Sequence, residues 1–116
     1  MAVTLYYTRK KPFQMSKWAD FVISAVRRSD ELGKITEVQI HQDRGDDLGP
    51  PQIVDKHIVA SDVKKGKKYI TIFRKGENDW EPGEYVRTYV KDGESYIRTD
   101  DNKVNCDNLG TLPDIE

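Results

Sequence analysis

The stretch YVRTYVKDGESYIRT, from Tyr85 to Thr99, decides the fold because its central turn fixes how two strands pair. Asp92-Gly93 is a two-residue loop of the kind that β-hairpins favour, since both turn positions require a positive φ. Such a loop leaves one register, and a shift of one residue would move every side chain to the opposite face. In that register Arg87 lies directly opposite Arg98. We therefore predict a hairpin with two arginines side by side.

Side chains alternate along the hairpin and separate into two faces. The face assigned to the core carries Val86, Thr88, Val90, Ile97 and Thr99. The other face is the candidate ligand-binding face, and it carries Tyr85, Arg87, Tyr89, Tyr96 and Arg98.

The opposed arginines admit two interpretations. They repel each other at a cost of roughly some tenths of a kcal/mol, so a further group must offset them. In the structural interpretation, carboxylates such as Glu84 or Asp100 neutralise the pair and tyrosine rings stack on the guanidinium planes. In the functional interpretation, Arg87 and Arg98 hold phosphate while a tyrosine stacks on a base, which makes the face an anion or nucleotide platform. The sequence leaves both interpretations open.

Further strands and one helix are predicted before the hairpin. Alternating and β-branched residues indicate strands over 20–28 and 35–42, and KKYITIFR indicates another over 67–74. The segments 41–52 and 78–84 carry the glycines and prolines of turns. The chain is therefore predicted to be an α+β domain of order ββαβββ. Its strongly twisted antiparallel sheet of about five strands, open or curled into a half-barrel, carries one short helix.

The helix is predicted between Asp55, a typical N-cap, and Gly66, a typical stop. Its apolar residues Ile58, Val59 and Val63 share one face at helical spacing. The helix end opens a basic run, the secondary basic patch, which consists of Lys64, Lys65, Lys67 and Lys68. The lysines of this run either lie in solvent at the helix end or contact phosphate.

Length and charge limit the organisation of the chain. Its 116 residues suffice for one modest core, so we predict one domain over 18–116 and an N-terminal arm over 1–17. A net charge of -1 excludes a global field that favours nucleic acid or membranes. The single cysteine, Cys106, and the lack of a leader or membrane span indicate a cytoplasmic protein. The strand-like Val3–Tyr7 of the arm could build a homo-oligomer by adding to a neighbour's sheet.

No catalytic or metal-binding set emerges from the sequence. His41 and His57 have no third ligand partner and are expected at the surface. The serines have neither a nucleophile-elbow glycine frame nor a histidine partner. The oxygen-rich end, 96–116, fails as a calcium loop because Leu109 falls where an oxygen ligand is required. We predict no metal, no cofactor and no enzymatic activity.

Three segments resemble a known family. They are WADFVISAVR (Trp18–Arg27), the loop Gly45-Asp46-x-Leu48-Gly49-x-Pro51 and, most specifically, YIRTDDNKVNCDNLGTLP (Tyr96–Pro113). The resemblance is to the small bacterial domain-of-unknown-function family 3892, whose members typically end in Tyr-x-Arg-Thr-Asp followed by Asp-Asn-Leu-Gly-x-Leu-Pro. It implies one intact bacterial domain. Because the family is uncharacterised, it implies no activity and no catalytic residues.

The C-terminal motif also has a physical role in the predicted fold. Its Asp and Asn side chains favour tight turns by bonding to nearby backbone amides. Leu109, Leu112 and Ile115 are then expected to plug the open end of the sheet. Gly110 allows the bend and Pro113 stiffens it. The motif is therefore predicted to close the domain.

Functions of three classes follow from these features. The first is a non-enzymatic binding module, carried by a phage, mobile element or bacterial accessory locus, which recognises a protein or a small anionic ligand. The alternative is a nucleic-acid-binding domain that uses the Arg/Tyr face together with the secondary basic patch. The third is a small enzyme of unknown class. No membrane partner is expected.

Overall fold

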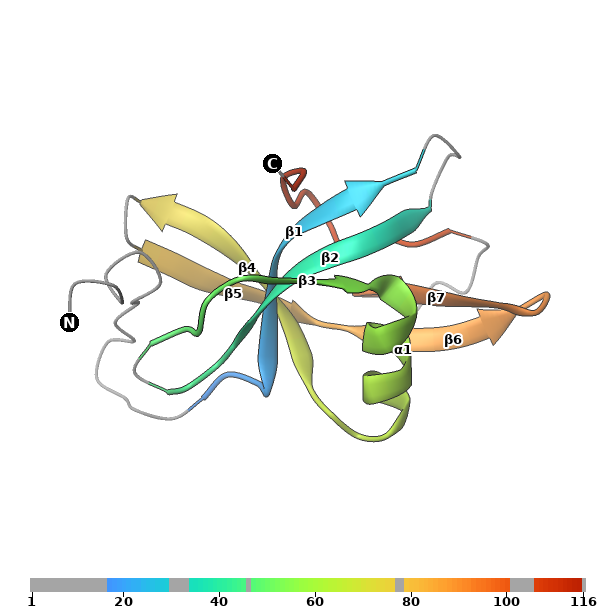
Figure 1. Ribbon diagram of the computed structural model, residues 1–116, viewed down its shortest axis with the longest axis horizontal. Helices are drawn as coiled ribbons and strands as arrows, with labels where there is room; N and C mark the ends of the chain where they lie inside the picture. Colours follow the sequence, from blue (N-terminus) through green and yellow to red (C-terminus); the bar gives the residue numbers. More distant parts are fainter. Residues whose placement is uncertain (1–16, 30–33, 46, 77–78, 101–105, 116) are drawn as a thin grey trace.

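The computed structural model describes residues 17–29, 34–45, 47–76, 79–100 and 106–115. The elements in chain order are β1 (Phe21–Arg28), β2 (Ile35–Gln42), β3 (Gln52–Asp55), α1 (Lys56–Lys64), β4 (Tyr69–Gly76), β5 (Asp79–Tyr85), β6 (Arg87–Lys91) and β7 (Glu94–Arg98). The predicted α+β class is confirmed, and the single described helix packs beside the hairpin β6–β7 (Figure 1). The Val3–Tyr7 strand of the arm lies outside the described residues.

The larger sheet has five strands in the order β3-β2-β1-β4-β5, and the hairpin forms a second, two-stranded sheet. Three of the four pairings in the larger sheet are antiparallel, as predicted. The fourth pairing, between β1 and β4, is parallel. The chain reaches β4 after a crossover through α1, which returns it to β1 in the same direction. The sheet is therefore mixed, and it stays open at β3 and β5.

The structure has two strands that the sequence does not predict: β5 lies on the predicted turn 78–84, and β3 begins at the last residue of the predicted turn 41–52. β3 directly follows Pro51, and β5 contains both Pro82 and Gly83. Both are edge strands, where a proline without an N–H can face away from the sheet and costs no ladder hydrogen bond. At Gly83 a Cβ would clash with the Thr71 side chain and lie 2.6 Å from Phe73 Cε2, so only glycine fits there.

The hairpin register is confirmed residue by residue. Arg87 lies opposite Arg98, and the pairing continues without a shift up to the turn. Asp92 and Gly93 have φ values of 53° and 80°, as the two-residue loop requires.

The assignment of the hairpin faces is wrong in part. Val90, assigned to the core, is 55% exposed, whereas Tyr96 and Arg98 of the other face are 2% and 4% exposed. The reason is that β7 is covered on both sides. Ile97 points into the core, and the C-terminal segment forms a bridge between Arg98 and Asn108. β6 lies outside this arrangement, so several of its side chains remain accessible.

Hydrophobic residues cover both faces of the larger sheet. One cluster joins the sheet to α1, the hairpin and the C-terminal segment, and its buried members include Ile23, Val38, Val59, Ile97 and Leu109. The second cluster consists of Ala19, Val22, Leu48, Ile70 and Ile72, with Trp18 and Trp80 packed against it. Because consecutive strand residues point to opposite sides, Val22 and Ile23 place the two clusters on opposite faces.

The C-terminal segment closes the domain, as predicted. Leu109 and Leu112 are buried in the first cluster. Gly110 has a φ of 85° at the bend, a conformation that glycine adopts without a steric penalty. The Asn108 side chain accepts a hydrogen bond from the Gly110 amide at 2.9 Å, which is the local turn that Asn favours.

Beyond the bend, the same segment lies beside β1 as a parallel neighbour. The Val26 amide donates to the Pro113 carbonyl at 3.0 Å, and the Ile115 amide donates to the Val26 carbonyl at 2.9 Å. Ile115 itself is half-buried. The segment therefore extends the sheet as well as plugging it.

The helix begins as predicted, with Asp55 as its N-cap accepting a hydrogen bond from the His57 amide at 2.7 Å. Gly66, with a φ of 101°, follows its C-cap. Val59 is buried, as predicted from the helical spacing. The prediction for Ile58 is wrong, because this residue is 50% exposed.

A buried ion pair joins the helix to the C-terminal segment. Lys56 Nζ lies 3.0 Å from Asp107 Oδ2, and both side chains are almost fully inaccessible. Asp107 also accepts hydrogen bonds from the backbone amides of Ile35, at 2.7 Å, and Ile97, at 2.9 Å. A buried charge persists only when it is paired and hydrogen-bonded. This one carboxylate therefore links α1, β2, β7 and the C-terminal segment.

Candidate anion-binding groove

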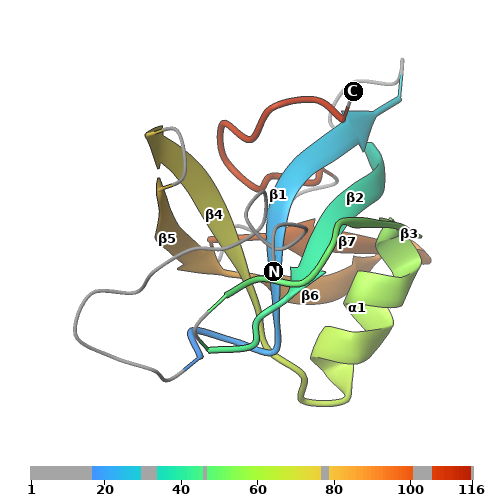
Figure 2. The same ribbon diagram turned by 60° about the vertical axis from the view of Figure 1, so that its left-hand side comes forward.

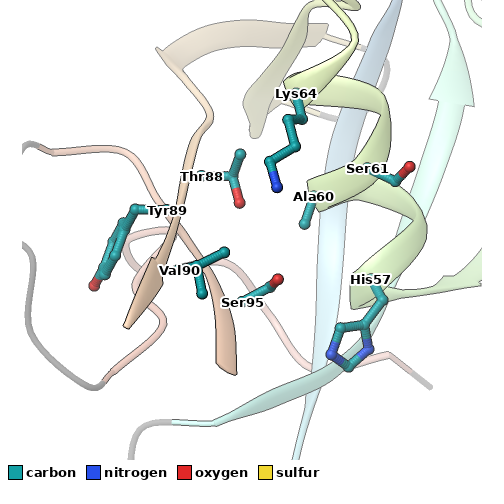
Figure 3. Close-up of a pocket in the computed structure, with 8 residues that line it drawn as sticks. All are labelled: His57, Ala60, Ser61, Lys64, Thr88, Tyr89, Val90 and Ser95. Atoms are coloured by element: carbon teal, nitrogen blue, oxygen red, sulfur yellow. The ribbon is translucent and has the colours of Figure 1, made fainter. Parts of the chain in front are cut away.

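A groove of about 180 Å³ lies between α1 and the hairpin, and we call it the helix–hairpin groove. The residues that line it are His57, Ala60, Ser61 and Lys64 of α1 and Thr88, Tyr89, Val90 and Ser95 of the hairpin (Figure 3). It unites one residue of the predicted ligand-binding face, Tyr89, with one residue of the secondary basic patch, Lys64.

Helical and strand periodicity explain why these side chains meet. Positions 57, 60, 61 and 64 follow the spacing that places residues on one face of a helix. On the hairpin, Val90 lies opposite Ser95, and residues directly opposite in an antiparallel pair share a face. Val90 is exposed because it forms a wall of this groove instead of filling the core.

The chemistry of the groove centres on Lys64. Figure 3 shows the Lys64 amine reaching toward the hairpin, where Thr88 and Ser95 carry hydroxyl groups. The Thr88 hydroxyl donates to the Tyr96 carbonyl at 2.9 Å, so its oxygen faces a ligand as an acceptor. No carboxylate belongs to the eight lining residues. The groove thus offers one cation, a hydroxyl donor and a hydroxyl acceptor to a ligand.

The His57 end of the groove borders two acids. His57 Nδ1 lies 2.8 Å from Asp55 Oδ1, and His57 Nε2 lies 3.9 Å from Glu94 Oε2. Hydrogen bonds from the His57 amide and imidazole lower the pKa of Asp55. The hydrogen bond from Lys56 lowers the pKa of Glu94. The groove is therefore polarised, with its cationic end at Lys64 and an acid-flanked end at His57.

Arg98 of the predicted ligand-binding face is engaged inside the protein. Its Nε and Nη2 lie 2.7 Å and 3.1 Å from the two carboxylate oxygens of Asp100, and Nη1 donates to the Cys106 carbonyl at 2.8 Å. The Asp100 hydrogen bonds raise the pKa of Arg98. Asp100 is thus the offsetting carboxylate that the structural interpretation requires, while Arg87 lies exposed opposite the pair.

The tyrosines of that face do not share one exposed surface: Tyr89 and Tyr96 contact each other, whereas Tyr85 lies on a different strand. Tyr89 and Tyr96 stack with ring centroids 5.6 Å apart, and in Figure 3 the Tyr89 ring points away from the groove. The ammonium groups of Lys34 and Lys56 lie 5.1 Å and 5.3 Å from the Tyr96 ring centroid. Tyr85 belongs to β5, where its hydroxyl donates to the Trp18 carbonyl at 3.0 Å. The five residues therefore form no continuous exposed platform.

The secondary basic patch is exposed but divided. Lys64 lines the helix–hairpin groove, whereas Lys65 caps the helix. Lys67 Nζ lies 3.9 Å from Asp62 Oδ1 and 5.8 Å from the Phe21 ring centroid. Lys68 anchors the start of β4 through its backbone amide, which donates to the Asp20 carboxylate at 2.8 Å. Only the first lysine of the run thus meets the hairpin.

The hydroxyl groups of the groove do not follow from the sequence patterns. Ser61 and Ser95 lie in no nucleophile motif, and the hairpin alternation predicts Thr88 as a core residue. The sequence does carry part of the information needed to find them, because the helical spacing and the hairpin register show which residues share each face. What the sequence lacks is the packing of one face against the other.

His41 is also placed wrongly by the sequence, since it is buried rather than at the surface. Its Nδ1 lies 3.0 Å from the Gly49 carbonyl, and its Nε2 lies 2.9 Å from Ser24 Oγ. A carbonyl only accepts, so the ring carries its proton on Nδ1 and accepts at Nε2 from Ser24. Burial lowers the pKa of His41, in keeping with a neutral ring. Gln39 extends this network by donating to Ser24 Oγ at 2.9 Å.

Within the described ranges, no group of three His, Cys, Asp or Glu side chains could hold a metal ion. Among the described helical residues, none forms a helix long and apolar enough to cross a membrane.

The fold and the groove define a class of protein: a small α+β domain with an open mixed sheet, a packed hairpin and a narrow polar groove. Residues 22–113 match the family described as Protein of unknown function (DUF3892), and the chain belongs to that family. The resemblance carried by the C-terminal motif is thus confirmed. No curated protein and no solved structure matches the chain.

Proposed function

We propose that this protein is a small, non-enzymatic binding module that takes a small anionic ligand in the helix–hairpin groove. The observation that carries the proposal is the meeting of Lys64 with Thr88 and Ser95 in a groove lined by no carboxylate. A cation beside a hydroxyl donor binds an anion through charge-assisted hydrogen bonds. We place the module in the cytoplasm, because a single cysteine suits a reducing compartment.

The size of the groove limits the ligand. A volume of about 180 Å³ lies below the roughly 300–1,000 Å³ of pockets for drug-sized molecules. A ligand of few heavy atoms fits it, such as phosphate or a short hydroxycarboxylate. The ligand anion pairs with Lys64, and a ligand hydroxyl donates to Thr88. Ala60 and Val90 supply the apolar walls for a methylene group.

Nucleic-acid binding receives less support as the alternative. A base-stacking platform needs exposed aromatic rings and accessible arginines, whereas Tyr96 and Arg98 are buried and engaged in internal contacts. The exposed lysines of the secondary basic patch remain its best support.

Titration by NMR tests the proposal. Isotope-labelled protein is titrated with inorganic phosphate, glycolate and acetate, and amide shifts are expected at Ser61, Lys64 and Ser95. Lys64→Gln should weaken phosphate binding by about tenfold or more, because it removes the charge-assisted contact. Lys65→Gln is the matched control, since its side chain carries the same charge one residue outside the groove.

The outcomes separate the two candidate functions. Equal effects of the two lysine substitutions, or shifts away from the groove, would contradict the proposal. Retention of a labelled oligonucleotide that falls steeply with salt, and that depends on Lys65, Lys67 and Lys68 rather than Lys64, would favour nucleic acid instead. Thr88→Val should weaken the binding of glycolate but not the binding of acetate, because only glycolate has a hydroxyl that donates to Thr88.

A further inference from the structure

The larger sheet splits between β1 and β4. The two strands pair only over Phe21–Ile23 and Tyr69–Thr71. Beyond these residues the C-terminal segment, residues 108–115, replaces β4 as the neighbour of β1, through the bridge between Val26 and Asp114. Figure 2 shows this segment lying between β1 and β4 at the end where the strands diverge. In open α/β sheets, ligands bind in the crevice at the carboxyl ends of parallel strands, and the split between β1 and β4 has a similar geometry.

A cleft of about 590 Å³ occupies this position, and we call it the sheet cleft. The residues that line it are Ser24, Ala25, Gln39, Phe73, Arg74, Trp80, Thr111, Pro113, Asp114 and Ile115. None of them lines the helix–hairpin groove. The sheet cleft is therefore a second, separate surface with a larger volume.

The walls of the sheet cleft are extended chains. On one side, the C-terminal segment is itself held on β1 by main-chain hydrogen bonds of 3.0 Å and 2.9 Å. On the other side, β4 pairs with β5 through one edge. Within the described ranges, no strand pairs with the other edge of β4 beyond Thr71. A strand edge of this kind presents a row of N–H and C=O groups that can take another strand.

The side chains of the cleft provide a carboxylate position beside apolar ones. The Arg74 guanidinium lies 4.5 Å from the Trp80 ring centroid. Stacking on the indole restrains the orientation of the guanidinium. The N–H groups of a guanidinium lie in its own plane, in a geometry that suits a carboxylate. Phe73 and Pro113 supply apolar contact surface nearby.

The floor of the cleft is fixed by the buried network. Gln39 donates to Ser24, which donates to His41, which donates to Gly49. These hydrogen bonds join the side chains of Gln39, Ser24 and His41 in one chain, which favours a single conformation of the floor. A rigid floor lowers the entropy cost of taking up a ligand.

We propose that the sheet cleft binds an extended peptide segment of a partner protein, which adds as a strand to β4. An Asp or Glu side chain of the peptide pairs with Arg74, and a neighbouring apolar side chain packs against Phe73 and Pro113. In this mode the main-chain hydrogen bonds provide affinity, and the alternate side chains provide specificity. The function differs from anion binding in the helix–hairpin groove and does not depend on it.

The experiment uses the full chain and a blocked peptide, acetyl-Thr-Val-Asp-Val-Thr-Val-amide. Amide shifts and slowed hydrogen exchange are expected at Phe73, Arg74 and 111–115. A peptide with N-methyl groups at alternate residues should bind at least about tenfold more weakly, because it cannot pair with a strand edge. Arg74→Gln should weaken the binding of the Asp peptide by about tenfold but leave the binding of the matching Asn peptide unchanged. Lys75→Gln, an exposed neighbour outside the cleft, should change neither.

Three results would each overturn the proposal. The first is the absence of any shift at about 1 mM peptide. The second is binding that survives N-methylation, which would exclude strand pairing. The third is an equal effect of the Arg74 and Lys75 substitutions on the Asp peptide, which would reduce the contact to non-specific charge attraction.

Discussion

At the scale of single residues, Asp107 lies where four parts of the chain meet. It pairs with Lys56 of the helix and accepts hydrogen bonds from the amides of Ile35 and Ile97. The carboxylate oxygens are acceptors only, so they suit a site that presents two amides and an ammonium group. The contacts of Asp107 therefore give this Asp of the C-terminal motif a structural role in the fold.

Asp107→Asn should lower the free energy of unfolding by about 3–5 kcal/mol, because it leaves the Lys56 charge buried without its main partner. Urea denaturation measures the change. The control is Asp114→Asn, which breaks a largely exposed pair with Arg28 and should cost less than about 1 kcal/mol. Adding Lys56→Met to Asp107→Asn should restore part of the loss. Equal losses for the two Asp substitutions would contradict this account.

His41 gives the fold a pH dependence of predictable sign. Its folded pKa lies below the ordinary value of 6.5, first because burial disfavours the charged ring. The unfolded chain therefore binds a proton at a higher pH than the folded one, and stability is lost as the pH falls below that value. Between about pH 7 and pH 5, the free energy of unfolding should fall more steeply in the wild type than in His41→Gln.

The matched control for His41 is the exposed His57. Because His57→Gln removes no buried ring, the difference between its slope and that of His41→Gln measures what the burial of His41 contributes. Denaturant unfolding at a series of pH values gives both slopes. An unchanged slope in His41→Gln would mean that other groups set the pH dependence.

At the scale of elements, the C-terminal segment acts as both plug and strand. Leu109 and Leu112 fill the core, and the chain beyond them pairs with β1. Ending the chain at Asn108 removes both contributions. Because each buried leucine contributes about 2–5 kcal/mol, against a total stability of about 5–15 kcal/mol, the shortened chain should melt well below the full chain and bind a hydrophobic dye.

Point substitutions can remove the buried leucine side chains while leaving the main-chain pairing with β1 in place. Leu109→Ala and Leu112→Ala should each lower the melting temperature, while Thr111→Ala, exposed between them, should change it little. Thermal unfolding followed by circular dichroism measures these shifts. If the chain ending at Asn108 melted at the temperature of the full chain, the segment would have no closing role.

The hairpin illustrates what local sequence can determine. Asp92-Gly93 fixes the register because a two-residue turn has few geometries, and the register is as predicted. The same local pattern fails at Tyr96 and Arg98, whose burial depends on the C-terminal segment covering β7. Alternation identifies two faces of a strand, but it does not report what packs on each face.

At the scale of the whole molecule, the features that the sequence predicts depend on local preferences, whereas the features that it misses depend on long-range packing. The helix cap at Asp55 and the bend at Gly110 follow from single-residue preferences and were predictable. The parallel pairing of β1 with β4 and the burial of His41 depend on segments distant in the chain. The helix–hairpin groove is of the same kind, because it needs two elements to meet. The sequence predicts Lys64 and Tyr89 as candidate binding residues, but not the hydroxyl groups that meet them in the groove.

Because β1 pairs with the C-terminal segment, the sheet cannot be completed until that segment has been synthesised. The side chains of Arg28 and Asp114 meet across 86 residues of chain. At roughly 5–20 residues per second, β1 leaves the ribosome's active site roughly 4–17 s before its last neighbour exists. An apolar strand with an open edge is prone to wrong pairing during such an interval. The domain therefore reaches its final form only after translation has passed Ile115.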